Sequence, residues 1–318
     1  MIVLQYNEKL ASDHFDLVKG LVIQSIDRVL LDGGIYKGKG SSRTLIAPSP
    51  SLERFLGLLS NNQGLETLIT GKPDRLEKYI SNVIRSNPNF TDSKESDYMI
   101  LYNIFATHSY KNDLFCKKQF IDNIGLDTCP YCNRNYTFTL SKTRKIKPQI
   151  DHFYPTSRYP FLAISYYNLI PSCETCNGFG GKCKTDPFIV GLVSPYKISN
   201  SDFTFSYRHL VLQPVNSLSK NQVKVCFSKK IQTNSDLFKL EDLYEKHNDH
   251  VVELILKRKL KYSKRYVKFL MKLKGLRLSE DEVDRMILGN YSKEDQIHKR
   301  PLAKLYQDIG MELGIFTR

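Results

Sequence analysis

Two Cys-x2-Cys pairs constrain what this chain can fold into more than any other feature of its sequence. The first pair is Cys129 and Cys132, and the second is Cys173 and Cys176, with forty residues between them. Two tight turns of this kind deliver the four thiolates that a tetrahedral Zn²⁺ prefers. We therefore expect all four cysteines to bind one structural zinc ion, which would staple a small segment that lacks the apolar mass to fold unaided.

Other interpretations of the cysteines are weaker. Unrelated buried cysteine pairs seldom occur twice in so short a stretch, and neither pair has the strand–helix context of a thioredoxin-like redox motif. The seven cysteines are an odd number, which does not suit a disulfide framework. The sequence shows neither a signal peptide nor an apolar run of about 18 residues, so we expect a cytoplasmic protein without a membrane partner.

Polar residues between and after the two pairs occur in an informative order. Asp151-His152 comes first, Asn168 follows sixteen residues after His152, and Asn177 directly follows Cys176. This order resembles the zinc-bracketed HNH endonuclease family, whose ββα-metal core cuts nucleic-acid phosphodiesters with one divalent ion. The resemblance covers residues 126–190.

The resemblance implies a role for each of these residues. Phosphodiester hydrolysis needs a base to deprotonate water and a hard cation to stabilise the phosphate. His152 would be the general base, Asp151 and Asn177 would bind Mg²⁺ or Mn²⁺, and Asn168 would pin the loop and orient the imidazole. The non-catalytic alternative is that His152 is a structural histidine beside a zinc knuckle.

Two details of the sequence qualify this comparison. Family members often carry a lysine three residues after the last asparagine, whereas here residues 178–181 delay Lys182, whose role stays open. These residues include three glycines, which should shorten the helix that the family has at this point. A second Asp-His pair, Asp13-His14, has no cysteine or asparagine nearby, and we interpret it as structural.

A polyanionic partner is expected from the charge of the chain. Its 47 Lys and Arg exceed its 33 Asp and Glu, which leaves a net charge of +14 and favours nucleic acid, with DNA preferred. Residues 251–276 have helical apolar spacing, and one face of this predicted helix, about 100° wide, would be basic and would contact phosphates. The residues of this basic face are Lys257, Lys261, Lys264, Arg265, Lys268 and Lys272. A solvated helix face, or a face that docks an acidic protein surface, would explain the same pattern.

The segment 299–309, taken with Cys-Pro-Tyr-Cys-Asn-Arg and Asp-His-Phe-Tyr-Pro, is similar to the nuclease subunits of Septu-type anti-phage systems. That looser resemblance implies an antiviral defence role and an ATPase partner. Two other functions remain open. One is a non-catalytic zinc module that binds nucleic acid or protein, and the other is a stand-alone restriction or homing endonuclease.

The elements favour an α+β fold, mostly helical, with the zinc-stapled HNH core inserted and a β-hairpin plus helices at the C-terminal end. We expect a helical region over 1–123, the HNH nuclease core over 124–195, and the basic C-terminal region over 196–318. Pro73 should begin a helix that stops at Asn87-Pro88. Further helices are predicted at 98–105 and 114–121, a strand at 136–140, and a strand pair within 200–230.

Overall fold

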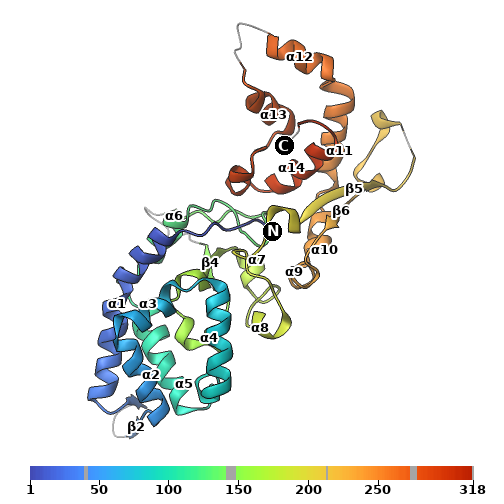
Figure 1. Ribbon diagram of the computed structural model, residues 1–318. Helices are drawn as coiled ribbons and strands as arrows, with labels where there is room; N and C mark the ends of the chain where they lie inside the picture. Colours follow the sequence, from blue (N-terminus) through green and yellow to red (C-terminus); the bar gives the residue numbers. More distant parts are fainter. Residues whose placement is uncertain (39–41, 141–147, 213, 273–277, 317–318) are drawn as a thin grey trace.

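The computed structural model describes residues 1–38, 42–140, 148–212, 214–272 and 278–316. Helices from residues 8–101 gather at one end of the molecule and helices from residues 248–312 at the other (Figure 1). The described strands form three two-stranded antiparallel sheets. The predicted α+β class is confirmed.

The N-terminal end is a group of helices with one small hairpin. Its elements are α1 (Glu8–Leu31), β1 (Ile35–Lys37), β2 (Thr44–Ile46), α2 (Pro50–Ser60), α3 (Asn62–Thr70), α4 (Pro73–Ser86), α5 (Ser96–Leu101), a π-helical segment (Tyr102–Tyr110) and α6 (Lys117–Ile124). Of the three helices predicted in this region, those at 73–87 and 98–105 are present, whereas the one predicted at 114–121 begins only at Lys117. Pro73 occupies the first turn of α4, and Gly125 ends α6 with a φ of 68°, a conformation that glycine adopts without strain.

The central part contains few regular elements. These are β3 (Gln149–His152), β4 (Leu169–Ser172), α7 (Glu174–Asn177) and α8 (Pro187–Val190). As expected, α7 is short, since it covers only four residues. The strand predicted at 136–140 is wrong as a regular element, because Tyr136 makes an isolated bridge with Thr128 and residues 137–139 are irregular.

The C-terminal end begins with the predicted strand pair, which is confirmed. Its elements are β5 (Thr204–His209), β6 (Val223–Lys229), α9 (Gln232–Leu237), α10 (Leu240–Glu245), α11 (Asn248–Leu256), a π-helical segment (Lys257–Lys261), α12 (Lys264–Lys272), α13 (Glu280–Leu288) and α14 (Ala303–Glu312). In the hairpin, Phe205 pairs with Phe227 and Tyr207 with Val225. None of the helices in the described ranges is long and apolar enough to cross a membrane.

Two hydrophobic cores hold these parts together. In the first core, Val18 of α1 packs in the same cluster as Cys129 and Ile170, so the N-terminal helices and the central segment share one interior. The second core joins the β5–β6 hairpin to α11 and α14 through residues such as Phe205 and Leu305. The cysteine-containing segment is therefore supported by packed helices and not only by its own few strands.

Candidate functional site

The four cysteines of the two Cys-x2-Cys pairs come together in a buried cluster. The ligand atoms of Cys129, Cys132, Cys173 and Cys176 all lie within 4.8 Å of one another. The Sγ atoms of Cys132 and Cys173 are 3.8 Å apart, and Zn–S bonds of about 2.3 Å would place the sulfurs of a tetrahedral site about 3.8 Å apart. Among the described residues, no other group of three or more His, Cys, Asp or Glu is close enough to hold a metal ion. The cluster can therefore hold a zinc ion.

Amide donors surround this cluster in a way that suits thiolate ligands. The backbone N–H of Arg134 donates to Sγ of Cys132 at 3.4 Å, and Nδ2 of Asn135 donates to Sγ of Cys173 at 3.3 Å. Such bonds orient metal-binding side chains and favour their charged form. Burial, together with the neighbouring Cys132 and Cys173 thiols, raises the pKa of the Cys129 thiol, and a bound cation would oppose that effect by favouring the thiolate.

A hairpin and a short helix lie directly beside the cysteines. Strands β3 and β4 pair antiparallel, with Asp151 opposite Ile170 and His152 opposite Leu169. Strand β4 leads into Cys173, and α7 follows with Cys176 and ends at Asn177. The order is strand, strand, helix. Cys173 immediately precedes the helix, and Cys176 lies within it.

Asp151 lies in a buried ion pair. Its Oδ1 accepts from Nζ of Lys182 at 2.9 Å, and its Oδ2 accepts from the hydroxyl of Tyr131 at 2.5 Å. Lys182 is fully buried and also donates to the carbonyl of His152 at 2.8 Å. Both carboxylate oxygens are thus engaged, which differs from the open metal ligand that the family resemblance implied.

A backbone carbonyl contacts the imidazole of His152. Its Nε2 lies 3.0 Å from the carbonyl oxygen of Ala163, and its ring is 4.5 Å from that of Tyr110. Because a carbonyl only accepts, Nε2 carries the proton of the neutral ring and Nδ1 is the basic nitrogen. Burial lowers the pKa of His152 to about 4, and the charges of Lys182 and Lys117 act in the same direction.

Asn168 fixes the loop that carries this carbonyl. Its Oδ1 accepts from the N–H of Tyr154 at 2.7 Å, and its Nδ2 donates to the carbonyls of Tyr154 and Leu162 at 3.1 and 2.9 Å. Because Ala163 directly follows Leu162, these bonds restrain the oxygen that His152 contacts. Asn168 therefore acts on His152 only through the loop.

Asn177 lies at the surface beside β3. Its Nδ2 donates to Oε1 of Gln149 at 2.8 Å, which leaves the amide oxygen as its atom suited to a cation. Asn177 and Gln149 line a cavity of about 330 Å³ together with Tyr110 and Lys117. Asp151 does not line this cavity, so the structure does not bring Asp151 and Asn177 to one open pocket.

The residues that sequence analysis missed lie around the first cysteine pair, Cys129 and Cys132. Tyr131 reaches Asp151, and Tyr244 of α10 donates to the carbonyl of Cys132 at 2.6 Å. Asn133, which has a φ of 49°, accepts from the N–H groups of Leu302 and Lys304 at 2.6 and 3.0 Å. The sequence offered one signal for this contact with the segment 299–309, namely that Asn133 directly follows Cys132. The segment 299–309 closes the protein interior here.

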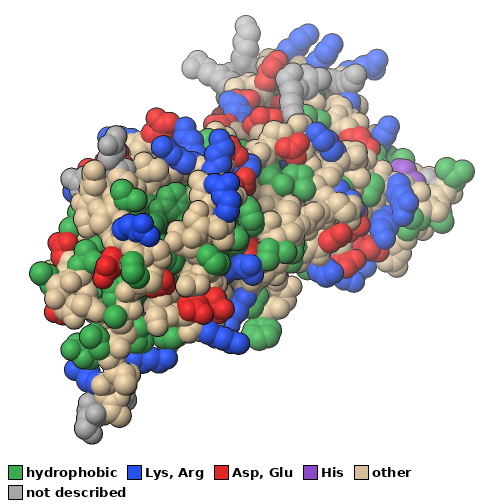
Figure 2. All heavy atoms as spheres, turned by 60° about the horizontal axis from the view of Figure 1, so that its bottom comes forward, with side chains coloured by type: hydrophobic (Ala, Val, Ile, Leu, Met, Phe, Trp, Pro, Cys, Tyr) green, Lys and Arg blue, Asp and Glu red, His purple; other side chains and the backbone are tan. Residues whose placement is uncertain are grey.

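The predicted basic face is divided. The helix predicted over 251–276 is wrong as a continuous element, since it breaks at Tyr262 and Ser263, and residues 273–276 lie outside the described part of the chain. Lys257 pairs with Glu253 at 2.8 Å, and Lys261 precedes the break. The remaining four residues of the face lie on α12, namely Lys264, Arg265, Lys268 and Lys272. On the face shown in Figure 2, Lys and Arg are spread over the surface and interspersed with Asp and Glu.

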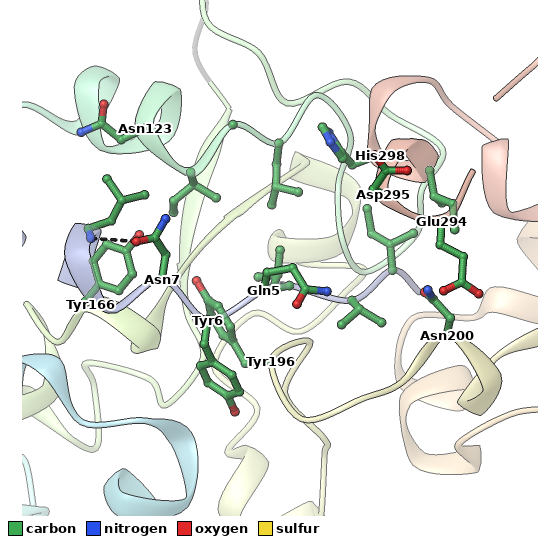
Figure 3. Close-up of a pocket in the computed structure, with 18 residues that line it drawn as sticks. Gln5, Tyr6, Asn7, Asn123, Tyr166, Tyr196, Asn200, Glu294, Asp295 and His298 are labelled. Atoms are coloured by element: carbon green, nitrogen blue, oxygen red, sulfur yellow. Dashed lines mark hydrogen bonds between the residues drawn. The ribbon is translucent and has the colours of Figure 1, made fainter. Parts of the chain in front are cut away.

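A separate cavity of about 480 Å³ lies between the N-terminal segment and residues 294–298. Figure 3 shows Tyr6, Tyr166 and Tyr196 at one side of it and Glu294 with Asp295 at the other. None of the site residues predicted from the sequence lines this cavity.

Comparison of the chain with protein-family models, with curated proteins and with solved structures finds no match.

Proposed function

We propose that this protein is a metal-dependent endonuclease of the HNH type that hydrolyses nucleic-acid phosphodiesters, with DNA as the favoured substrate. The observation that carries the proposal is the β3–β4–α7 arrangement beside four clustered cysteines, with His152 at the end of β3. In this function Zn²⁺ bound to the cysteines is structural, and the chemistry takes place at His152.

In the proposed reaction Nδ1 of His152 accepts a proton from water. The water oxygen forms a bond to phosphorus, the bond from phosphorus to the 3′ oxygen breaks, and that oxygen leaves with a proton from solvent. The products are a 5′ phosphate and a 3′ hydroxyl. Asn168 keeps the Ala163 carbonyl against Nε2, which holds the ring in the tautomer that leaves Nδ1 basic.

A divalent ion, Mg²⁺ or Mn²⁺, would stabilise the charge on the phosphate when bound. Asn177 can offer its amide oxygen to such an ion. Asp151 can join the same shell only after it exchanges Lys182 or Tyr131 for the metal, because both of its carboxylate oxygens are engaged.

The proposed partners follow from residues outside the core. Lys261, Arg265, Lys268 and Lys272 are exposed and would contact substrate phosphates on the two sides of the helix break. An ATPase partner and a role in antiviral defence depend on the Septu-like sequence segments alone.

A second function is favoured by one observation. The buried pairing of Asp151 with Lys182 is what a purely structural aspartate makes, so a non-catalytic zinc module is the alternative. In that case His152 and Asn177 would be dispensable for binding of nucleic acid or protein.

Cleavage assays separate the two functions. Plasmid DNA and a long RNA are incubated with the zinc-loaded protein, with and without Mg²⁺, and the same assay is run on His152→Ala. We expect Mg²⁺-dependent cleavage that falls by about 10² or more in His152→Ala, which is typical for loss of a general base. His14→Phe is the matched control and should cleave normally. A folded, zinc-loaded protein that cuts neither polymer would leave the non-catalytic module as the function.

A further inference from the structure

Nuclease chemistry needs positive charge at the phosphate. Lys182, the first lysine after the Cys173–Cys176 pair, does not supply it. Lys182 is fully buried, with its Nζ at 2.9 Å from Asp151 and 2.8 Å from the His152 carbonyl. Its charge neutralises the buried carboxylate of Asp151, and a substrate cannot reach it. A cation for the phosphate must come from elsewhere.

Lys117, the first residue of α6, lines a cavity together with residues of β3. Its Nζ is 4.8 Å from the centre of the Tyr110 ring, and that ring is 4.5 Å from the ring of His152. Lys117 and Tyr110 line the cavity of about 330 Å³ together with Gln149 and Asn177. The cavity thus combines a cation and two amide side chains. His152 does not line it, but its ring contacts Tyr110, which does.

The contact of Lys117 with two aromatic rings, Tyr110 and Phe115 at 5.5 Å, restrains the side chain at the cavity.

We propose that the cavity between α6 and β3 binds a phosphate of the substrate and that Lys117 is the catalytic cation that contacts it. This inference rests on the proposed nuclease function. It gives the N-terminal helical region a direct part in the site, because α6 belongs to that region and the histidine does not. Gln149 and Asn177 also line the cavity, where Nδ2 of Asn177 donates to Oε1 of Gln149.

The test compares two adjacent lysines of one helix. Lys117→Met removes the charge at the cavity, whereas Lys118→Met removes a charge that is exposed and paired with Asp122 at 3.0 Å. Cleavage of plasmid DNA and binding of a short DNA duplex over a range of salt concentrations are measured on both variants. Lys117→Arg, which keeps the charge, controls for folding.

We expect Lys117→Met to cleave at least tenfold more slowly, Lys117→Arg to recover most of the rate, and Lys118→Met to behave as the wild type. The slope of log K against log salt should fall by about one unit in Lys117→Met alone. If the wild type cleaves and Lys117→Met matches Lys118→Met in both assays, the inference is wrong and the nuclease function stands. If the wild type does not cleave but the salt slope falls only in Lys117→Met, the phosphate site stands and the nuclease function fails.

Discussion

His14 and His152 make nearly the same contact in two different regions of the molecule. Nε2 of His14 lies 2.8 Å from the carbonyl oxygen of Ile164, and Nε2 of His152 lies 3.0 Å from that of Ala163. These are consecutive carbonyls of one loop. Burial is the main cause that lowers the pKa of each imidazole to about 4. Each histidine also follows an aspartate, so neither the dipeptide nor the ring contact distinguishes a catalytic from a structural histidine.

The surroundings make the difference. The ring of His14 is packed among Phe115, Phe120 and Tyr166, at 5.4 to 5.7 Å, and the neighbouring Asp13 is exposed. By contrast, Asp151 is buried and paired, and the hairpin that carries His152 leads into two of the clustered cysteines. His152 becomes a candidate base because its strand, β3, pairs with the strand that leads into the cysteine cluster and contributes Gln149 to the cavity of about 330 Å³.

The largest effect that would test this contrast is loss of the proposed zinc. Because β4 leads directly into Cys173, Cys173→Ser should unfold the His152 hairpin, and binding of a structural zinc typically contributes about 10 kcal/mol or more to folding. Elemental analysis of the purified protein should give one zinc per chain. Hydrogen exchange should show loss of protection in β4 before α1.

Cys116→Ser is the matched control, since Cys116 is an exposed cysteine outside the cluster. A soluble wild-type protein with far less than one zinc per chain, or equal loss of protection in α1 and β4, would contradict the prediction.

The next effect concerns the two aspartates. Lys182→Met leaves Asp151 buried without its cation, which should lower the free energy of unfolding by about 3–5 kcal/mol in urea titrations. Asp13→Asn changes an exposed aspartate and should cost little. In the double variant Lys182→Met, Asp151→Asn the buried charge is gone, so much of the stability should return. Equal small losses of stability for Lys182→Met and Asp13→Asn would show that Asp151 and Asp13 do not differ in this respect.

Local signals of the sequence were sufficient for part of this picture. The spacing of the four cysteines predicted their cluster, Pro73 and Asn87-Pro88 predicted the ends of α4, and alternation predicted the β5–β6 pairing. In each case the information lies in neighbouring residues, where backbone geometry and side-chain period decide the outcome.

Other features depend on contacts that are distant in the sequence. The partner of Lys182 is 31 residues away, and the spacing of the chain does not indicate which lysine will be buried with a carboxylate. Apolar spacing continues through Tyr262, yet the chain leaves the helix there with a φ of −111° and a ψ of 66°. A periodic pattern cannot reveal such a break when the residues on both sides still suit a helix.

The smallest effect would show whether His14 is only structural. His14→Phe keeps a ring beside Phe115, Phe120 and Tyr166 but leaves the carbonyl of Ile164 without its donor, so at pH 7 the variant should be about 1–2 kcal/mol less stable. In acid the wild type loses stability through protonation of His14, and the variant does not. The pKa of His14 is about 4 in the folded protein and 6.5 when exposed, so protonation favours the unfolded chain.

The contribution of neutral His14 is therefore complete above pH 6.5 and is lost as the pH falls towards 4. Between pH 7 and pH 5 the wild type should lose about 2 kcal/mol relative to His14→Phe, so the two proteins should become nearly equal in stability at pH 5. His152 titrates in both proteins and cancels in the comparison. Urea unfolding at the two pH values measures the change. A stability difference that stays constant would mean that burial does not keep His14 neutral, and the two histidines would then differ in their ring chemistry as well as in their surroundings.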